Sequence, residues 1–262
     1  MSYLERMRPA PGLRVLITAG ASGIGAATAQ AFLEAGARVA ICDANDAALE
    51  AFSAQHPDVL AILADVSDTA AVSAMMDQVA AHFGALDVLV NNAGIAGPTG
   101  RVEDLDLDEI RQTLDVDVLG QFIVLQRAIP LLRKGQDAVI LNVASVAGRL
   151  GYPLRTPYAA AKWGVVGLTA SLAKEIGPDG IRVNAILPGP VRGPRMDRVM
   201  QDRAKAEGRT FEDVREEYLG IISLRRMIGP EDVAGMALFL ASPAAGGIAG
   251  QAISVCGNVE TL

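Results

Sequence analysis

A tyrosine and a lysine four residues apart, Tyr158 and Lys162, are the side chains whose types and spacing point most directly to chemistry. On a helix, residues four apart lie on one face, with Cβ atoms about 5–6 Å apart. The Lys162 ammonium would then lie near the Tyr158 phenol and favour its phenolate form. A phenolate accepts a proton and a phenol returns it, so the pair predicts proton transfer at Tyr158.

A glycine-rich segment near the N-terminus reads Thr18-Ala19-Gly20-Ala21-Ser22-Gly23-Ile24-Gly25. It follows an apolar run typical of a strand and precedes an alanine-rich run typical of a helix. In that context the backbone N–H groups of the turn can hold a dinucleotide pyrophosphate at the helix N-terminus. Such turns are common, so the segment alone is a weak signal. Together with the Tyr–Lys pair it indicates hydride transfer coupled to proton transfer.

Asp43 ends the second apolar run, about 20 residues beyond the turn, where a carboxylate can accept hydrogen bonds from the adenosine ribose hydroxyls. The same carboxylate would repel a 2′-phosphate, and the following Ala44 and Asn45 offer that phosphate no cation. The sequence therefore favours NAD over NADP. The alternative is an aspartate that only starts a turn.

Short runs rich in Val, Ile and Leu alternate with longer segments of helical period. The expected strands are Leu13–Thr18, Ala37–Asp43, Val59–Ala64, Leu86–Asn91, Ala138–Ala144, Ile181–Leu187 and Ala252–Val255. The expected helices are Gly23–Ala35, Ala47–Ala54, Thr69–Phe83, Leu107–Leu132, Pro157–Ile176 and Pro230–Leu240. Strands this apolar have no wet face, so we expect one doubly wound, Rossmann-type α/β domain over residues 1–262, with a seven-stranded parallel sheet between helices.

The segment from about 192 to 226 breaks this alternation, because it is dense in Arg, Glu and Asp and follows Pro188-Gly189-Pro190. Long insertions in compact domains are often mobile lids over a pocket. A solvated helical excursion is the other interpretation, and both stay open here.

The composition favours small-molecule chemistry. The 262 residues are 51% hydrophobic, enough for one large core, and the net charge of −7 argues against nucleic acid or an anionic membrane as a partner. Cys42 and Cys256 end apolar runs, so we expect buried reduced thiols. His56 and His82 have no ligand partner at metal spacing, so no metal site is expected. Without a signal-like N-terminus or a bilayer-length apolar run, we expect a cytoplasmic protein.

These motifs, in this order, resemble the short-chain dehydrogenase/reductase family, in its soluble Tyr-x-x-x-Lys branch, over essentially the whole chain. Ala19 stands where the first glycine of that family's turn is expected. The resemblance implies a set of cofactor-contacting positions that share the turn, the strand ends and the helical pair. They are Gly20, Ser22, Gly23, Ile24, Gly25, Asp43, Asp65, Val66, Asn92, Ala93, Gly94, Tyr158, Lys162, Pro188, Gly189 and Val191.

The resemblance also implies a catalytic group of Ser145, Tyr158 and Lys162. Ser145 precedes Tyr158 by 13 residues and would hydrogen-bond the substrate oxygen, while Lys162 would bind the nicotinamide ribose. Thr156-Pro157 resembles a helix N-cap and first position, which would put Tyr158 in the first turn.

The fourth family residue is an Asn thought to hold a water of the proton relay, and here that position is Asp117. An aspartate also supplies an acceptor oxygen, so a relay can persist. Its negative charge would keep Lys162 protonated and, by itself, disfavour the Tyr158 phenolate. The net effect on activity is left open.

Substrate signals are thinner. The segments that flank the substrate in this family carry Arg149, Arg155, Arg192 and Arg195, beside Ser145 and Tyr158. Arg149, Arg155 and Arg192 are the guanidiniums that we expect to grip an anion, because Arg can bind a carboxylate bidentately. The alternative is that they point to solvent or pair with the acidic run beyond. Gly193 replaces the family's usual Thr after the Pro-Gly, and the tail Gly250–Leu262 resembles a segment that packs between subunits in family tetramers.

The sequence therefore predicts an NAD-dependent oxidoreductase that interconverts a secondary alcohol and a ketone on a small polar or anionic substrate, such as a sugar, sugar acid or hydroxy acid. The resemblance further implies a homotetramer. A 3-oxoacyl-type ketone reductase is the alternative enzyme. A non-catalytic NAD-binding protein, in which Asp117 and Ala19 mark a decayed site, is the alternative from another class.

Overall fold

The computed structural model describes residues 2–259 and contains one sheet of seven parallel strands in the order β3-β2-β1-β4-β5-β6-β7. The strands are β1 (Arg14–Thr18), β2 (Arg38–Asp43), β3 (Leu60–Leu63), β4 (Val88–Asn91), β5 (Val139–Val143), β6 (Arg182–Pro188) and β7 (Ala252–Val255). The expected seven-stranded parallel sheet is confirmed. The order reverses between β1 and β4, and in such sheets ligands bind beyond the carboxyl ends of the strands at this point.

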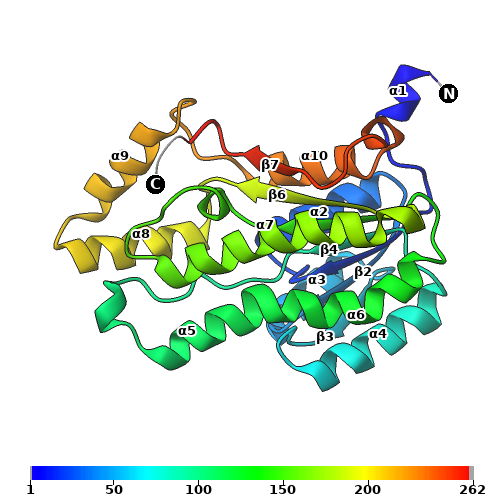
Figure 1. Cartoon of the computed structure of the whole chain (residues 1–262), viewed down its shortest axis with the longest axis horizontal. Helices are drawn as coiled ribbons and strands as arrows, with labels where there is room; N and C mark the ends of the chain where they lie inside the picture. Colours follow the sequence, from blue (N-terminus) through cyan, green and yellow to red (C-terminus); the bar gives the residue numbers. More distant parts are fainter. Residues whose placement is uncertain (1, 260–262) are drawn as a thin grey trace.

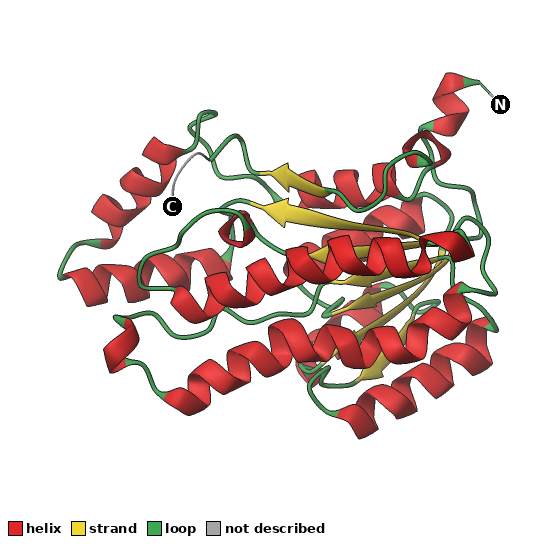
Figure 2. Ribbon diagram, in the orientation of Figure 1, coloured by secondary structure: helices red, strands yellow, loops and turns green. Residues whose placement is uncertain are grey.

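Helices cover both faces of the sheet (Figures 1 and 2). One layer holds α2 (Gly23–Glu34), α3 (Asp46–Gln55) and α10 (Pro230–Leu240). The opposite layer holds α4 (Thr69–Phe83), α5 (Leu107–Leu114), α6 (Gly120–Leu132) and α7 (Thr156–Ile176). A short N-terminal helix, α1 (Tyr3–Arg6), lies outside these layers (Figure 1).

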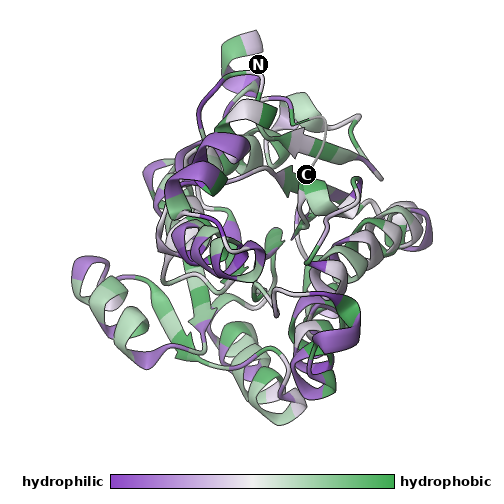
Figure 3. Ribbon diagram, turned by 90° about the vertical axis from the view of Figure 1, so that its left-hand side faces the viewer, coloured by the Kyte–Doolittle hydropathy of each residue, from purple (hydrophilic) through white to green (hydrophobic). Residues whose placement is uncertain are grey.

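Alternate residues of the central strands enter two different cores. On β1, Val15 and Ile17 pack with α2 and α10, whereas Leu16 packs with α4 and α6. Because both faces of the central strands are buried, these strands are apolar at most positions, and Figure 3 shows green strands among helices that carry purple residues. An apolar run therefore predicts that a strand is buried, but it does not predict which face of the sheet each residue occupies.

The long helix expected at Leu107–Leu132 is interrupted. Residues Asp115–Leu119 form a π-helical segment, η2, between α5 and α6. π-Helical turns are rare and often lie at functional sites. Here the segment holds Asp117, whose carboxylate is bonded on both sides as described below. The expectation of one regular helix was wrong because no residue type marks this change of helical pitch.

Residues 192–226 form two further helices, α8 (Pro194–Glu207) and α9 (Phe211–Ile221), beyond the carboxyl ends of the strands (Figure 1). Arg203 and Arg209 each pair with both Glu207 and Glu217, so the two helices are joined by a network of four charges. The excursion is therefore helical and internally cross-linked. Its action as a lid stays a prediction.

Both cysteines, Cys42 and Cys256, are free and buried, as expected. Burial raises the pKa of the Cys42 thiol to about 12, so the thiol stays protonated near neutral pH. The end of the predicted subunit-packing tail, residues 260–262, lies outside the described residues.

Asp87 ties together the amino ends of three neighbouring strands. Its carboxylate accepts hydrogen bonds from Arg14 Nε (2.8 Å), Arg14 Nη2 (2.7 Å), the backbone N–H of Arg14 (2.8 Å) and that of Gln136 (2.9 Å). Burial alone would raise the pKa of Asp87, but the bonds from Arg14 and the backbone outweigh burial and hold the pKa below its usual value. The ionised carboxylate is thus part of the fold.

We expect Asp87→Asn to lower the free energy of unfolding by about 2 kcal/mol at pH 7, because Arg14 loses its buried partner. A carboxyl group with a depressed folded pKa stabilises the fold above its unfolded pKa of about 3.9, and this contribution is lost as the pH falls through the folded pKa. The difference between wild type and variant should therefore shrink below about pH 4, measured by urea unfolding.

Asp77→Asn is the matched control, because Asp77 makes one exposed ion pair with Arg127 and should cost less than about 0.5 kcal/mol. An Asp87→Asn cost that is the same at pH 7 and below pH 4 would contradict this account.

Candidate active site

The glycine-rich turn joins β1 to α2 and brings the backbone close to the next strand. A Cβ on Gly25 would lie 2.0 Å from the carbonyl oxygen of Ala19 and 2.7 Å from Asn92 Nδ2, so only glycine fits. Ser22 caps α2 without a side-chain hydrogen bond to the first-turn N–H groups. Those N–H groups are therefore available to an anion, as a pyrophosphate site requires.

Ala19 has a φ of +49°, in the left-handed region that favours glycine. This is the position where the family's turn has a glycine, so the departure carries a backbone cost of about 1 kcal/mol but keeps the turn. Thr18 Oγ1 accepts the N–H groups of Asn92 and Ala93, both at 2.9 Å. Asn92 Nδ2 donates in return to the carbonyls of Thr18 and Ala19, both at 3.0 Å, and so holds the turn against β4.

Asp43 lies at the carboxyl end of β2, directly beside this turn. Its Oδ2 accepts the Ala21 N–H at 3.2 Å and its Oδ1 accepts the Asn45 N–H at 3.0 Å. The carboxylate is therefore oriented at the edge of the turn, where the sequence placed it.

The residues after β3 play different parts. Asp65 is exposed and accepts the backbone N–H (2.9 Å) and the hydroxyl (2.7 Å) of Ser67. Val66 is buried against Gly120, whose added Cβ would lie 2.7 Å from Val66 Cγ2. Both lie at the carboxyl edge of the sheet.

Tyr158 lies in the first turn of α7. The N-cap is Arg155, and Thr156 and Pro157 occupy the first two helical positions, so the expectation of a Thr156 cap was wrong by one residue. Arg155 fills the cap position without a side-chain hydrogen bond to the helix. Tyr158 still lies in the first turn, near the positive end of the helix dipole.

Lys162 and Asp117 form a buried ion pair beneath Tyr158. Lys162 Nζ lies 3.1 Å from Asp117 Oδ2, with 4% and 0% of the two side chains exposed. The same Nζ lies 3.5 Å from the carbonyl oxygen of Val143 and 5.5 Å from the Tyr158 ring centroid. Asp117 Oδ1 accepts the Ile95 N–H at 2.6 Å. The structure therefore brings three of the four predicted catalytic residues together.

Ser145 follows β5 and caps the short 3₁₀ helix η3 (Val146–Gly148), with its Oγ accepting the Ala147 N–H at 3.1 Å. This helix lies directly on α7, because a Cβ on Gly148 would lie 2.5 Å from the carbonyl oxygen of Lys162. Ser145 also stands two residues after Val143, which contacts Lys162 Nζ. The fourth residue is thus held at the same end of α7 as the other three.

Three consecutive residues after β4 are fixed by charged side chains from three elements. Arg195 Nη1 on α8 donates to the Gly94 carbonyl (2.9 Å), Asp117 accepts the Ile95 N–H, and Arg155 Nη2 donates to the Ala96 carbonyl (2.5 Å). The loop that borders the cluster is therefore held from η2, α7 and α8 at once.

The three arginines predicted to grip a substrate lie in different places. Arg149 donates to Ser254 Oγ (3.3 Å) and the Ala252 carbonyl (2.5 Å) and so lies on β7. Arg192 pairs with Glu231 at the start of α10. Neither Arg149 nor Arg192 lies beside Tyr158. Arg155 does lie beside Tyr158, but its guanidinium is buried.

The last predicted cofactor positions lie at the carboxyl end of β6. A Cβ on Gly189 would lie 2.7 Å from Cys256 Cβ, so glycine is needed there, directly after Pro188. Val191 pairs with Ile228 in a short parallel bridge. These residues continue the same edge of the sheet.

Sequence reasoning missed Tyr218 on α9, whose hydroxyl lies 2.5 Å from the Tyr152 hydroxyl. Burial, followed by the nearby Tyr218, raises the pKa of Tyr152 well above its usual value. The bond joins the 192–226 excursion to the segment that precedes Tyr158. A lone tyrosine in a charged helix gives no signal of such a partner.

Comparison with known proteins places this geometry in a family. A family model described as enoyl-(acyl carrier protein) reductase matches residues 18–258. A 2,5-dichloro-2,5-cyclohexadiene-1,4-diol dehydrogenase of Sphingobium indicum is 35% identical over 254 residues, covering 96% of this chain and 98% of that protein. The chain belongs to the short-chain dehydrogenase/reductase family.

A second relative in this family is the cis-4-hydroxycyclohexanecarboxylate dehydrogenase of Sinomonas cyclohexanicum, 37% identical over 94% of this chain and 96% of that protein. The solved structure of an NAD⁺-bound xylitol dehydrogenase is also similar, with a TM-score of 0.91 and 29% identity over 95% of this chain and 99% of that one. The predicted family and the predicted oxidoreductase class are both confirmed.

Short-chain dehydrogenases use nicotinamide cofactors, and the residues present fit such a group. The turn admits a close backbone approach only because Gly25 lacks a Cβ, and the N–H groups of α2 beside it carry no side-chain cap. Within residues 2–259 no cluster of His, Cys, Asp and Glu is suited to a metal ion, and no helix is long and apolar enough to cross a membrane.

We expect Gly25→Ala to weaken NADH binding by at least about 10-fold, because the added Cβ forces the Ala19 carbonyl out of the turn. Fluorescence titration of NADH measures the loss, and thermal unfolding shows whether the variant remains folded.

Ala19→Gly is the control in the same turn. It restores glycine at a left-handed position, so it should keep NADH binding and raise stability by about 0.5–1 kcal/mol. Equal binding by wild type and Gly25→Ala would remove this turn from the cofactor site.

Proposed function

We propose that this short-chain dehydrogenase is NAD-dependent and interconverts a secondary alcohol and a ketone. The observation that carries the proposal is the buried Lys162–Asp117 pair beneath Tyr158, at the sheet edge that also holds Ser145, Asp43 and the glycine-rich turn. A proton-transferring phenol and a dinucleotide turn at one edge are what such a reaction needs.

The chain's residues divide the chemistry among them. The bound nicotinamide supplies hydride transfer to or from the carbinol carbon. Tyr158 as phenolate takes the hydroxyl proton during oxidation and returns it during reduction. Ser145 donates a hydrogen bond to the same substrate oxygen, and Lys162 stabilises the phenolate with its charge.

Asp43 supports NAD as the cofactor. Both of its carboxylate oxygens are held by backbone N–H groups at the edge of the turn, one of them from Ala21 within the turn itself. A fixed negative charge there accepts ribose hydroxyls and repels a 2′-phosphate.

For the substrate, we propose a small ring alcohol that is polar or anionic, such as a sugar, a sugar acid or an alicyclic hydroxy acid. Two relatives are named for cyclohexadiene-diol and hydroxycyclohexanecarboxylate oxidation, which supports a hydroxyl on a six-membered ring. A 3-oxoacyl thioester is the alternative substrate, in keeping with the acyl-carrier-protein name of the matching family model.

The test is a panel of cyclic diols, alicyclic hydroxy acids, sugars, sugar acids and 3-oxoacyl thioesters, with NAD(H) or NADP(H), followed at the absorbance of the reduced nicotinamide. We expect NAD-linked oxidation of a ring alcohol, and a loss of at least about 10³-fold in kcat/KM for Tyr158→Phe, because phenylalanine cannot take the proton.

Tyr152→Phe removes a hydroxyl that is bonded to Tyr218 and serves as the matched control. It should lose far less activity than Tyr158→Phe. Turnover of 3-oxoacyl thioesters and of no ring alcohol would support the alternative function, a 3-oxoacyl-type ketone reductase. Tight NAD binding without turnover of any panel member would favour the non-catalytic protein.

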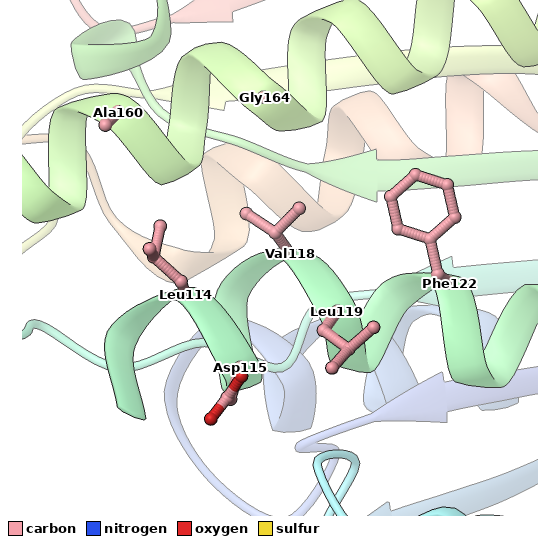
Figure 4. A pocket seen from close by; sticks show the side chains of 7 residues that line it. All are labelled: Leu114, Asp115, Val118, Leu119, Phe122, Ala160 and Gly164. Carbon is pink, nitrogen blue, oxygen red and sulfur yellow. The ribbon is translucent and has the colours of Figure 1, made fainter. Parts of the chain in front are cut away.

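We further propose that the protein is a homo-oligomer that buries the outer face of α5, α6 and α7. A groove of about 390 Å³ lies there between the helices, lined by Leu114, Asp115, Val118, Leu119, Phe122, Ala160 and Gly164. Figure 4 shows Leu114, Val118 and Phe122 pointing toward α7, where Gly164 leaves room. Exposed apolar side chains gathered on one face suit a self-complementary contact with a second copy. Tetramer formation and a cytoplasmic location stay predictions.

We expect Phe122→Glu to shift the protein to a smaller species in sedimentation velocity, because it places charges in the apolar face. Leu63→Glu is the control, since Leu63 on β3 is 57% exposed, compared with 44% for Phe122, but lies on the edge strand. A wild-type monomer, or equal effects of both variants, would contradict this surface.

A further inference from the structure

Arg155 is a buried cation beside Tyr158 that the proposed chemistry has not yet used. Arg155 is only 3% exposed to solvent. Its guanidinium carbon lies 5.1 Å from the Tyr158 ring centroid and 5.4 Å from the Tyr152 ring centroid. Nη2 donates to the Ala96 carbonyl, whereas Nε and Nη1 are buried without a hydrogen-bond partner. This geometry differs from the exposed clamp expected for a substrate carboxylate.

No carboxylate compensates this charge. Within residues 2–259 Arg155 forms no ion pair with any Asp or Glu. Burying a cation without an anion is costly, so an arginine kept in this place needs a negative charge in at least one working state. Among the described residues, the Tyr152 and Tyr158 rings lie beside the guanidinium and contact each other edge to face, with 6.5 Å between their centroids, and each carries a hydroxyl that can ionise.

Tyr152 is not suited to supply that charge. Its hydroxyl is bonded to Tyr218, and burial together with Tyr218 holds the pKa of Tyr152 well above its usual value. Tyr152 therefore stays neutral in the range where the enzyme would work. Among the described residues, that leaves the Tyr158 phenolate as the anion beside Arg155.

The Lys162 charge is already balanced. Asp117 lies 3.1 Å from Lys162 Nζ inside the protein, so this pair contributes no net charge to its surroundings. With an Asn at position 117, as in the family pattern, Lys162 alone would balance the phenolate. With Asp117, the phenolate, the carboxylate and the Lys162 ammonium together carry a net charge of about −1. A second cation is needed to make the site neutral, and the Arg155 guanidinium lies 5.1 Å from the Tyr158 ring centroid.

We infer that Arg155 is a positioning residue that stabilises the Tyr158 phenolate and offsets the negative charge that Asp117 introduces. Two cations lie near the phenol ring, Lys162 Nζ at 5.5 Å and the Arg155 guanidinium carbon at 5.1 Å from its centroid, and Lys162 is the one that pairs with Asp117. The Ala96 bond fixes the guanidinium in this place. This inference rests on the proposed function, in which Tyr158 moves the proton.

Other charged groups near α7 are not placed to balance the charge of the Tyr158 phenolate. Arg195 on α8 is exposed and donates to the Gly94 carbonyl. The remaining charges on the elements packed against the first half of α7 are exposed to solvent, namely Asp108, Glu109 and Arg111 on α5 and Asp115 on η2. Arg182 and Asp179 lie at the other end of α7, where β6 begins.

The test is a cycle of four proteins: wild type, Arg155→Met, Asp117→Asn and the double variant. Oxidation needs the phenolate, so kcat/KM rises with pH through a midpoint. Loss of the Arg155 cation should raise this midpoint by about one pH unit, with activity recovered above it, and loss of the Asp117 charge should lower it. In the double variant the midpoint should return to within about 0.3 units of wild type.

Arg155→Lys is the matched control, because it keeps the charge and should keep the midpoint. A purely structural role for Arg155 would lower kcat/KM by the same factor at every pH and in both backgrounds, and that result would overturn the inference. An unchanged midpoint in Arg155→Met would overturn it too.

A second readout needs no substrate and separates this inference from the proposed function. The absorbance of phenolate is measured as a function of pH for each of the four proteins, and again for each protein with Tyr158→Phe added. The difference between the two titration curves reports the ionisation of Tyr158 alone. A midpoint raised in Arg155→Met, without turnover of any substrate, would support the charge balance while the proposed function failed. Turnover with identical difference titrations would retain the function and overturn the role of Arg155. If Arg155→Met does not fold, Arg155→Gln takes its place, because glutamine also removes the charge, and Arg155→Lys remains the control.

Discussion

The Lys162 ammonium and the Asp117 carboxylate lie 3.1 Å apart, with only 4% and 0% of the two side chains exposed to water. Removing one partner of such a pair would leave an unpaired buried charge, which typically costs about 3–5 kcal/mol. The pair fixes α7 to the π-helical segment η2, and through the Ile95 N–H it fixes the loop after β4. The position of Tyr158, one turn before Lys162, follows from this contact.

Glycines around the Lys162–Asp117 pair allow the neighbouring backbone to pack closely against it. A Cβ on Gly94 would lie 3.0 Å from Lys162 Nζ and 3.2 Å from Asp117 Oδ1, and one on Gly148 would meet the Lys162 backbone. The polar ladder from Asn91 through Asn142 to Thr169 links β4, β5 and α7 behind the site. The parallel sheet thus supplies the edge, small residues allow close approach, and charged side chains set the positions at that edge.

Much of the fold follows from the sequence, because strands buried on both faces are apolar at most positions and the glycine-rich turn marks where β1 ends. The closeness of Tyr158 and Lys162 could be predicted from their spacing of four residues on one helix, and the position of Ser145 was expected from the family resemblance. The π-helical turn at Asp117 and the burial of Arg155 could not, because both depend on contacts with Ile95 and Ala96 across the fold. Arg149 and Arg192 show the same limit: their types suggested an anion, but β7 and Glu231 hold them elsewhere.

The most direct test of the central claim is a crystal structure of the protein with NAD and an unreactive substrate analogue. The account predicts one ligand oxygen within hydrogen-bond distance of both Ser145 and Tyr158, the nicotinamide ribose at Lys162, and Lys162 still paired with Asp117. A nicotinamide bound away from Tyr158, or an analogue oxygen held by other residues, would contradict it.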